Sequence, residues 1–371
     1  MMKRLLLACA GLCLAAHSAL AEDAPAPAAA PSSSKLYIYN WSEYFAPDTL
    51  EKFEKETGIK VVYDVYDSND MLEAKLYAGN TGYDLVFPTN FPYFFRQLAA
   101  GVYQPLDTTK LPDLKNSDPS LVNPLKKDGK LYATPYMWGS FSIGVNVDKV
   151  APLFDGKIPD SWDLIFNPEN MKKLSSCKVA FVDSPVYVYP ILMNFLGLPR
   201  NSTDYAQYEK ASAVMRSVRP YITYFHDSQY MNDLANGNVC VAFGWSGDLV
   251  LARNRAKESG NKINIQVINP KEGSLLLYDV VAMPKDAKNV DAALQFMNFL
   301  MRPEIAAEIT DYVGFPNAIP GSTKLLAPGV AEDPAVYPPE PIRKNLFTPA
   351  ELPLPLEKQL HRDWARMKAS R

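Results

Sequence analysis

The segment Leu36–Tyr44, with the sequence LYIYNWSEY, decides the fold and marks the first candidate site. Leu36–Tyr39 is typical of a short strand, and Pro47-Asp48-Thr49 begins a helix soon after it. In an open α/β sheet, ligands bind where the end of a strand leads into the next helix. Trp41–Tyr44 places an indole, a hydroxyl, a carboxylate and a phenol there, which suits an organic cation. The alternative is that the two rings are core residues and the carboxylate is a solvated loop charge.

The elements that follow alternate between strand and helix. Ile59–Val65 is rich in β-branched and aromatic residues and predicts a second strand, and Tyr83–Phe87 predicts a third. Between them, Asp67-Ser68-Asn69 caps a helix over Asp70–Ala78. This β-α-β-α-β order with short connections predicts a parallel, doubly wound sheet. Thr89 follows the third strand and so lies at the same edge as the first loop, where it can bind a ligand or cap the next helix.

A second α/β unit follows a strand predicted over Phe141–Val147. It has a strand over Cys177–Val182, a helix that ends at Gly197 and a buried strand over Val239–Phe243. Two such units that are connected twice predict two lobes with a hinge and a cleft between them. We assign residues 35–139 and 267–308 to the first lobe, and residues 140–266 and 309–371 to the second, with approximate boundaries.

The composition is that of a soluble globular protein. The chain has 371 residues, of which 47% are hydrophobic and 21% charged. This length suits two domains or two lobes. The formal net charge of −3 argues against nucleic acid as a partner.

Met1–Ala21 is predicted to be a cleavable secretory signal peptide. A basic pair precedes an apolar run, and Ala19-Leu20-Ala21 forms an A-x-A cleavage site. Residues 22–34 are mostly Ala, Pro and Ser and predict a flexible linker. No later run reaches the ~20 apolar residues of a membrane span, so we expect an exported protein. Lipidation at Cys9 is an alternative, although cleavage there would leave almost no apolar region.

Two of the four cysteines follow the signal peptide. Cys177 and Cys240 are an even pair in an exported chain, which favours a disulfide. The chain-entropy model values the loop that this bond closes at roughly 4 kcal/mol. The alternative is a pair of buried free thiols.

Motifs of covalent chemistry are absent from the sequence. It contains no G-x-G-x-x-G or P-loop for phosphate, and no Cys/His cluster with zinc spacing. Gly244-Trp245-Ser246-Gly247 is one residue short of a nucleophile elbow. We therefore expect a protein that is not an enzyme and that holds no metal or cofactor.

An aromatic ring beside a carboxylate recurs at predicted strand ends. The three instances are Trp41 and Tyr44 with Glu43, Trp245 with Asp248, and Tyr278 with Asp279. Each alone could be structural. Together they predict a box in which carboxylates bind ammonium groups and rings cover the methylenes between them.

On these residues the sequence resembles the periplasmic polyamine-binding proteins of bacterial ABC importers. It resembles their putrescine-binding group more than the spermidine-preferring one. The most specific stretches are Ile38–Tyr44, Glu54–Asp64, Ser228–Gly237 and Gly244–Asp248. The resemblance covers the chain from Leu36 to about Met367. It implies a type II fold, in which two α/β lobes, each a mostly parallel sheet flanked by helices, enclose the ligand, and it implies a disulfide between Cys177 and Cys240.

The resemblance also assigns ligand contacts to this chain, position by position. The positions that match the family unchanged are Trp41, Ser42, Tyr44, Trp245, Asp248 and Asp279. Three others match with a change of residue. Glu43 stands where Asp is usual, Thr89 stands where the group has Ser, and Phe315 stands where Tyr is expected.

The opposite wall departs from the family. Val186-Tyr187 replaces a Glu pair, one member of which binds the ligand, and Leu277 replaces an aromatic residue. Asp227 stands where the group has Ser, and we hypothesise that it supplies the missing carboxylate. The alternative is that Asp227 caps a helix that begins near Gln229.

The sequence therefore predicts a monomeric periplasmic protein that captures an aliphatic di- or polyamine of the putrescine type. It would deliver this ligand to the permease of an ABC transporter. A second interpretation keeps the fold but changes the ligand to agmatine, cadaverine, spermidine or a non-polyamine, because the Val186, Tyr187, Asp227 and Leu277 wall is unusual. A periplasmic enzyme or a sensor partner is the third.

Overall fold

This computed structural model describes residues 35–260 and 262–370. The fold is built on a mixed β-sheet. Its strands lie in the order β2-β1-β3-β11-β6-β9-β7-β8, with β10 paired to β6, and β4 and β5 form a separate hairpin. The strands are β1 (Lys35–Trp41), β2 (Lys60–Tyr66), β3 (Leu85–Val86), β4 (Lys126–Lys127), β5 (Lys130–Leu131), β6 (Ala133–Asn146), β7 (Val179–Phe181), β8 (Tyr224–Phe225), β9 (Val241–Trp245), β10 (Ile265–Ile268) and β11 (Leu276–Ala282). The predicted signal peptide, the predicted linker and Cys9 lie outside the described residues.

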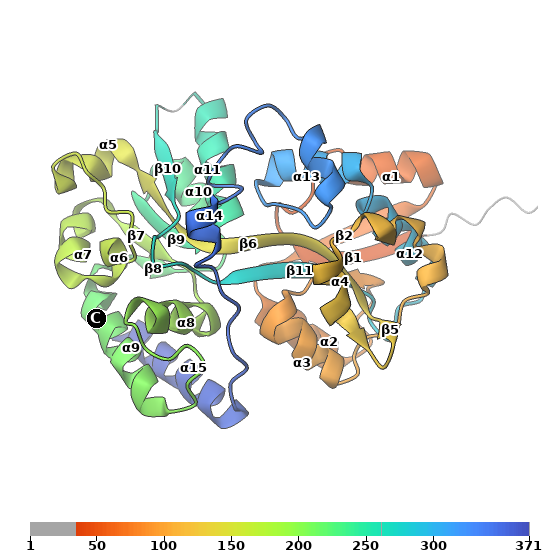
Figure 1. Cartoon of the computed structure of the whole chain (residues 1–371), viewed down its shortest axis with the longest axis horizontal. Coiled ribbons are helices and arrows are strands. Elements are labelled where there is room, and N and C mark those ends of the chain that lie inside the picture. The colour runs from red at the N-terminus through yellow and green to blue at the C-terminus, as the bar shows by residue number, and fades with distance from the viewer. Residues whose placement is uncertain (1–34, 261, 371) are drawn as a thin grey trace, which may run out of the picture. The chain divides into compact units, whose positions relative to one another are not determined.

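Helices cover both faces of the sheet (Figure 1). In the half that contains β1–β3, α1, α12 and α13 lie on one side and α2 and α3 on the other. The α-helices are α1 (Thr49–Thr57), α2 (Asn69–Ala78), α3 (Phe95–Ala99), α4 (Pro119–Val122), α5 (Val147–Val150), α6 (Asp163–Phe166), α7 (Pro168–Leu174), α8 (Pro185–Phe195), α9 (Tyr205–Val218), α10 (Gln229–Ala235), α11 (Ser246–Glu258), α12 (Val290–Leu300), α13 (Pro303–Val313), α14 (Glu340–Arg343) and α15 (Leu354–Ala369). No helix in the described part of the chain is long and apolar enough to cross a membrane.

The predicted β-α-β-α-β unit at the start of the fold is confirmed. Leu36, Ile38 and Asn40 of β1 are fully buried and alternate with partly exposed residues, as the period of a strand requires. β1 pairs in parallel with both β2 and β3. The carboxyl ends of these three strands therefore meet at one edge, which places the loops after them side by side.

The centre of the sheet is antiparallel, which the sequence did not predict. β6 pairs with β11 through residues 133–140 and with β9 and β10 through residues 141–146, all antiparallel. β6 carries the chain from the first half of the sheet to the second and β11 carries it back, as Figure 1 shows, so the two strands run in opposite directions. The outer strands of the second half, β7, β8 and β9, return to parallel pairing.

Two large hydrophobic cores correspond to the two lobes. One joins side chains of β1–β3, α1, α12 and α13, and the other joins those of β7, β9, α8, α9 and α15. Ile309, Val313 and Ile319 belong to the first core, although the sequence assigned residues after 308 to the second lobe. The exact division of the chain between the lobes stays a prediction.

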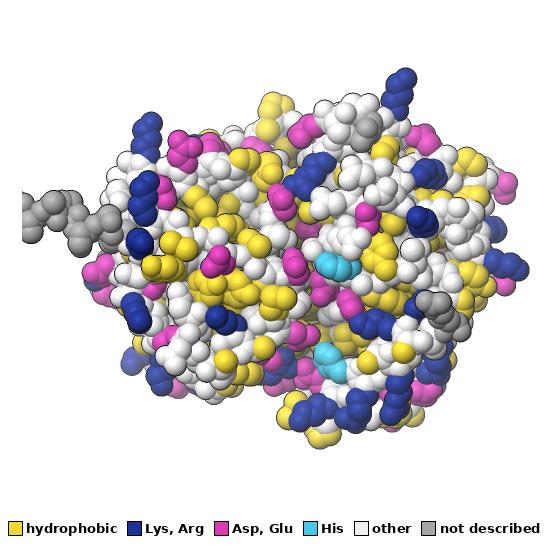
Figure 2. All heavy atoms as spheres, turned by 180° about the vertical axis from the view of Figure 1, so that it is seen from behind, with side chains coloured by type: hydrophobic (Ala, Val, Ile, Leu, Met, Phe, Trp, Pro, Cys, Tyr) yellow, Lys and Arg dark blue, Asp and Glu magenta, His cyan; other side chains and the backbone are white. Residues whose placement is uncertain are grey.

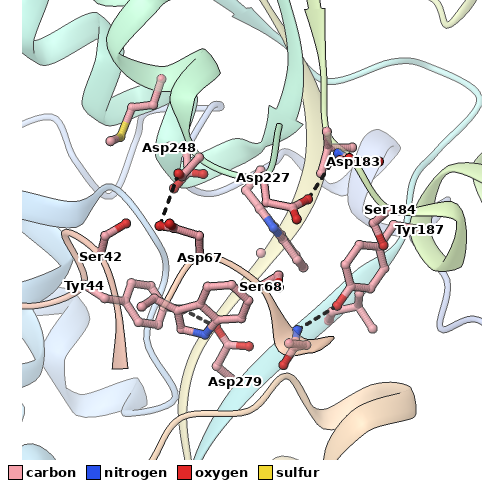
Figure 3. A pocket seen from close by; sticks show the side chains of 18 of the residues that line it. Ser42, Tyr44, Asp67, Ser68, Asp183, Ser184, Tyr187, Asp227, Asp248 and Asp279 are labelled. Atoms are coloured by element: carbon pink, nitrogen blue, oxygen red, sulfur yellow. Dashed lines mark hydrogen bonds between the residues drawn. The ribbon is translucent and has the colours of Figure 1, made fainter. Parts of the chain in front are cut away.

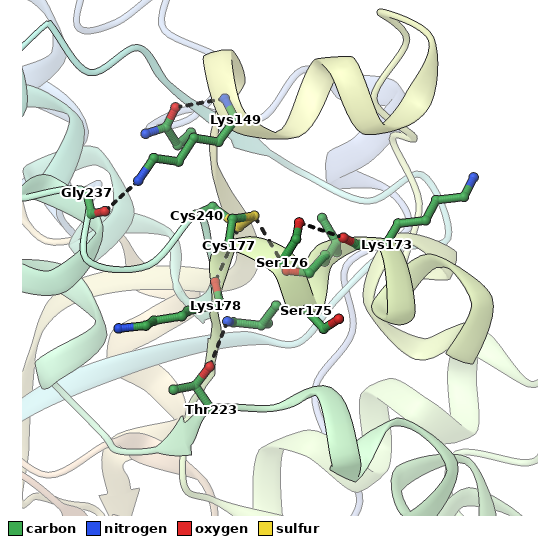
Figure 4. The surroundings of a disulfide bond; sticks show 12 residues. Lys149, Lys173, Ser175, Ser176, Cys177, Lys178, Thr223, Gly237 and Cys240 are labelled. Carbon is green, nitrogen blue, oxygen red and sulfur yellow. Dashed lines mark hydrogen bonds between the residues drawn. A yellow bond between two sulfur atoms is a disulfide. The ribbon is translucent and has the colours of Figure 1, made fainter.

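A disulfide joins Cys177 to Cys240, as predicted (Figure 4). The two Cα atoms are 5.5 Å apart. The bond lies at the start of β7 and β9, which are parallel neighbours, and the Cys240 amide also donates to the Lys178 carbonyl at 3.0 Å. The alternative of two free thiols is therefore wrong.

Candidate functional site

A cavity of about 70 Å³ lies among loops that come from both lobes (Figure 3). The strand ends and helix starts that the sequence singled out contribute to it, together with β6 and β11. Its lining consists of Trp41, Ser42, Tyr44, Asp67, Ser68, Asn69, Asp70, Tyr93, Met137, Gly139, Val182, Asp183, Ser184, Tyr187, Asp227, Ser228, Met231, Trp245, Asp248, Leu277, Asp279 and Phe315.

The cavity is acidic. Six aspartates line it, and no lysine, arginine or histidine of the described residues does so. Acidic side chains also gather around the hollow in the middle of the face seen in Figure 2. Low-dielectric walls that carry one sign of charge focus the electrostatic field and attract the opposite charge. The site is therefore built for a cation.

Asp279 on β11 is a buried carboxylate with one free oxygen. The Tyr44 hydroxyl donates to Asp279 Oδ2 at 2.7 Å, whereas Oδ1 has no hydrogen-bond partner. Burial raises the pKa of Asp279 to about 7, and the polar side chains of Thr89 and then Tyr44 oppose that shift. A buried oxygen without a donor costs free energy unless a ligand supplies the donor. Asp279 Oδ1 is thus a free hydrogen-bond acceptor that a ligand can use.

Asp248 lies in the first turn of α11, directly after β9. Its Oδ2 accepts a hydrogen bond from the Tyr230 hydroxyl at 2.5 Å. Burial raises the pKa of Asp248 to about 6. The negative charge of Asp248 also raises the pKa of Asp279, which means that the two carboxylates act on the same part of the cavity.

Asp227 lies between β8 and α10 on the Asp183 side of the cavity (Figure 3). Its Oδ1 accepts a hydrogen bond from the Asp183 amide at 3.1 Å. Burial, and then the charge of Asp183, raise the pKa of Asp227 to about 8. Asp227 does not cap α10, because His226 Nδ1 accepts from the Ser228 and Gln229 amides instead. The capping alternative is therefore wrong.

Aromatic rings from both lobes form the walls. The Trp41 indole nitrogen donates to the Phe87 carbonyl at 2.9 Å, which fixes its ring. Tyr44 meets the Phe315 ring edge-on, with 5.5 Å between centroids. Trp245 packs on Phe141 at 4.2 Å. The rings are core residues and cavity walls at once, so the two interpretations of the Trp41 loop do not exclude each other.

The position of Phe315 depends on two glycines. A methyl group on Gly247 would lie 2.0 Å from the Phe315 ring, and one on Gly139 would lie 2.8 Å from it. Gly247 belongs to the Gly244–Asp248 motif that the sequence singled out. The wall therefore requires Gly247, since only a residue without a side chain lets the Phe315 ring lie over the start of α11.

The unusual wall is only partly as predicted. Tyr187 in the first turn of α8 and Leu277 on β11 both line the cavity and are buried. The Asn69 side-chain amide donates to the Tyr187 hydroxyl at 3.1 Å, which links α2 to α8 across the cavity. Val186 does not line this cavity but faces a second hollow, beside Pro190 and Leu352.

Two other candidate residues lie outside the lining. Thr89 is fully buried, and its hydroxyl accepts from the Asn69 amide at 2.9 Å rather than capping the helix that follows. Glu43 has a φ of 59°, in the left-handed region, and its carboxylate accepts from Arg255 of α11 at 2.6 Å. Its side chain is 43% exposed. Glu43 therefore lies outside the cavity lining and pairs with Arg255, and its contact with an ammonium group stays a prediction.

The sequence missed part of the site. Asp67, Ser68, Asn69 and Asp70 line the cavity, although the sequence indicated only a helix cap, and Ser68 does accept from the Met71 amide. These residues follow β2 at the same edge as Trp41, so the strand-end rule could have found them. Asp183 also lines the cavity and was not assigned to the site. No group of three or more His, Cys, Asp or Glu side chains in the described residues could hold a metal ion.

Comparisons with known proteins agree with this arrangement. Residues 48–338 match the model of the bacterial extracellular solute-binding protein family. The putrescine-binding periplasmic protein SpuD of Pseudomonas aeruginosa is 48% identical over 355 residues, which cover 95% of this chain and 96% of that protein. The putrescine-binding periplasmic protein PotF of Escherichia coli is 50% identical over 347 residues, which cover 92% and 93%. A solved structure named for a spermidine/putrescine ABC transporter from Listeria monocytogenes has a TM-score of 0.79 at 30% identity, and the match covers 91% of this chain and 100% of that one.

Proposed function

Because the chain belongs to the family of bacterial extracellular solute-binding proteins, we propose that it binds a short aliphatic diamine of the putrescine type. The observation that carries this proposal is the charge of the cavity, which six aspartates line without a described cationic side chain. Relatives that are named for putrescine are 48% and 50% identical to this chain. The fold is the two-lobed type II fold that the sequence predicted.

One ammonium group of the ligand binds between Asp279 and Asp248. Asp279 Oδ1 is the buried oxygen without a donor, and Asp248 carries the neighbouring charge. A hydrogen bond to a charged group contributes about 1.5–3 kcal/mol net. The donor that Asp279 lacks is supplied by the ammonium group, so binding also removes the cost of a buried unpaired acceptor.

The second ammonium group binds at Asp227, which replaces the carboxylate that Val186-Tyr187 removed. Between the two ends, the methylenes lie against Trp41, Tyr44, Trp245 and Phe315. Cation–π attraction to these rings adds roughly 0.5–2 kcal/mol for each contact. Together these terms reach the ~8 kcal/mol of a micromolar complex.

The cavity favours a short ligand. Its volume of about 70 Å³ is far below the roughly 300–1,000 Å³ of pockets for drug-sized molecules. Putrescine and cadaverine suit this volume better than spermidine does. Agmatine is the second candidate, because the Tyr187 hydroxyl and Asp227 replace the family's wall with groups that can accept from a planar guanidinium.

The protein works in transport rather than in catalysis. The signal peptide Met1–Ala21 directs it to the periplasm, where it acts as a monomer and delivers the amine to the permease of an ABC transporter. Its two lobes close around the ligand. Two relatives are named putrescine-binding periplasmic proteins and a solved structure is named for a spermidine/putrescine ABC transporter, which supports this assignment.

A thermal-shift screen tests the proposal. The panel holds putrescine, cadaverine, agmatine, spermidine, amino acids and sugars at 1 mM. A ligand with a micromolar Kd stabilises the folded protein by about 4 kcal/mol at that concentration. We expect the largest shift with putrescine and none with sugars. The absence of a shift with every amine would overturn the proposal, and turnover of a bound amine would indicate an enzyme.

A further inference from the structure

Asp227 is supported by a chain of contacts that ends on the last helix, α15. The Asp183 amide donates to Asp227 Oδ1 at 3.1 Å. The Asp183 carboxylate in turn accepts from Lys368 Nζ, at 2.7 Å to Oδ1 and 2.5 Å to Oδ2. The Trp364 indole nitrogen donates to the same Oδ1 at 2.7 Å. Residues 183, 227 and 368 are far apart in the sequence, yet they form one connected unit behind the cavity.

The far end of this chain of contacts is itself fixed. Arg219 donates to the Lys368 carbonyl through Nε at 3.1 Å and through Nη2 at 2.8 Å. Trp364 is buried, and its ring meets Phe225 edge-on at 5.3 Å. Lys368 is only 32% exposed in its side chain. The Lys368 ammonium group is thus held against the Asp183 carboxylate by a helix that packs on the core.

The charges explain why this support matters. Asp183 and Asp227 are two carboxylates beside one cavity, and like charges close together disfavour ionisation of both. The charge of Asp183 raises the pKa of Asp227, and the charge of Lys368 lowers it. The other titratable groups around Asp227 are Asp70, Tyr187, Tyr230 and its neighbour His226. Of the charged side chains that shift the pKa of Asp227, Lys368 carries a positive charge and the two aspartates a negative one.

We propose that Lys368 and Trp364 are positioning residues of the binding site. They neutralise and fix Asp183, so that Asp227 keeps its place and can ionise when an ammonium group arrives. The inference rests on the proposed function, since it concerns an amine at Asp227. It extends the site from the cavity, through Asp183, to the C-terminal helix.

The test measures the affinity for putrescine by isothermal titration calorimetry at pH 6, 7, 8 and 9. Lys368→Met should weaken binding roughly tenfold at pH 7, and the loss should shrink at pH 9, because alkali ionises Asp227 without help. Aliphatic ammonium groups still carry their charge at that pH. Lys368→Arg should restore binding. Lys358→Met, an exposed lysine of the same helix, should behave like the original protein.

Two further variants keep the test decisive. Trp364→Phe removes the indole donor and keeps a smaller aromatic ring in the core, and it should show a smaller loss with the same dependence on pH. If Lys368→Met does not fold, Trp364→Phe decides. In a double-mutant cycle, Lys368→Met should cost no further affinity once Asp227→Asn is present.

The outcomes separate the inference from the proposed function. If the original protein binds no amine at any pH, the proposed function fails. If it binds putrescine but both helix variants match it, the inference is overturned. A loss that is equal at every pH and that persists in the Asp227→Asn background would also overturn it, because that loss would reflect damaged packing alone.

Discussion

Each wall of the cavity carries a carboxylate for an ammonium group, but the protein holds the two carboxylates in different ways. In the first wall, Trp41 ends β1, Tyr44 lies in the loop after it, and Asp279 lies within β11. The Asp279 carboxylate accepts from the Tyr44 hydroxyl, and its Oδ1 has no hydrogen-bond partner. In the second wall, Asp227 is held by the Asp183 amide, which depends on Lys368 of α15. Asp279 therefore offers an oxygen without a protein donor, whereas Asp227 is held in place by a series of contacts that leads to α15.

This difference shows which changes a binding site tolerates. A wall built on the sheet and the loops directly after its strands keeps its geometry as long as the sheet folds. A wall built from three distant segments can lose or move a carboxylate through changes elsewhere. The departure at Val186-Tyr187 and Asp227 falls in the second wall, where support comes from outside the cavity. Ligand choice should therefore change more readily through this wall.

The largest effect should come from the first wall. Asp279→Asn removes the charge that pairs with an ammonium group, and the loss of one partner of a buried charge pair costs about 2–5 kcal/mol. We expect putrescine affinity to fall by about 100-fold or more, measured by calorimetry. Asp291→Asn, at an exposed position, is the matched control and should bind normally. Unchanged affinity in Asp279→Asn would remove this residue from the site.

Asp227→Asn tests the second wall in the same way. We expect a loss of at least tenfold, which corresponds to about 1.4 kcal/mol. The loss should be smaller than that of Asp279→Asn, because the buried Oδ1 of Asp279 has no protein donor, whereas Asp227 Oδ1 accepts from the Asp183 amide. Equal losses would show that the two walls do not differ as proposed, and no loss would reject the relocated carboxylate.

Gly247→Ala tests the ring that joins the walls. The added methyl group would meet the Phe315 ring at 2.0 Å, so the ring must move. Overpacking of this kind costs about 1–3 kcal/mol of unfolding free energy. We expect that destabilisation in a denaturant titration, together with several-fold weaker amine binding. Gly321→Ala, whose methyl group would have its nearest neighbour at 3.8 Å, should change neither. A Gly247→Ala variant as stable as the original would contradict the close packing.

Glu43→Gln should have the smallest effect. Its ion pair with Arg255 lies at the rim, with side chains 43% and 26% exposed, and such pairs contribute about 0.2–1 kcal/mol. We expect a two- to fivefold loss of affinity at low salt that disappears in 0.5 M NaCl, because salt screens exposed charges. A loss as large as that of Asp279→Asn would mean that Glu43 contacts the ligand after all.

The sequence predicted the first wall well because its signals are local. A strand such as Leu36–Tyr39 followed by a helix start is visible in one short segment, and the parallel order of β1–β3 then places Asp67–Asp70 beside it. The antiparallel centre was not predicted, because the pairing of β6 with β11 depends on two crossings between the lobes that lie far apart in the sequence.

The second wall was predicted only in outline, for the same reason. Asp227 was singled out by a departure from the family, whereas Asp183 and Lys368 were not assigned to the site. Their contact is purely tertiary. Glu43 was assigned to the ligand because its position matches, whereas its left-handed backbone turns the side chain toward Arg255.

The most direct test of the central claim counts the protons that leave when putrescine binds. Burial raises the pKa values of Asp248, Asp279 and Asp227 to about 6, 7 and 8, so at pH 7 the empty site holds protons that an ammonium group must displace. Calorimetry in buffers of different ionisation enthalpy measures this number. We expect roughly one to two protons released at pH 7 and an affinity that rises from pH 5 to pH 8. Binding without proton release, and with an affinity independent of pH, would contradict the account.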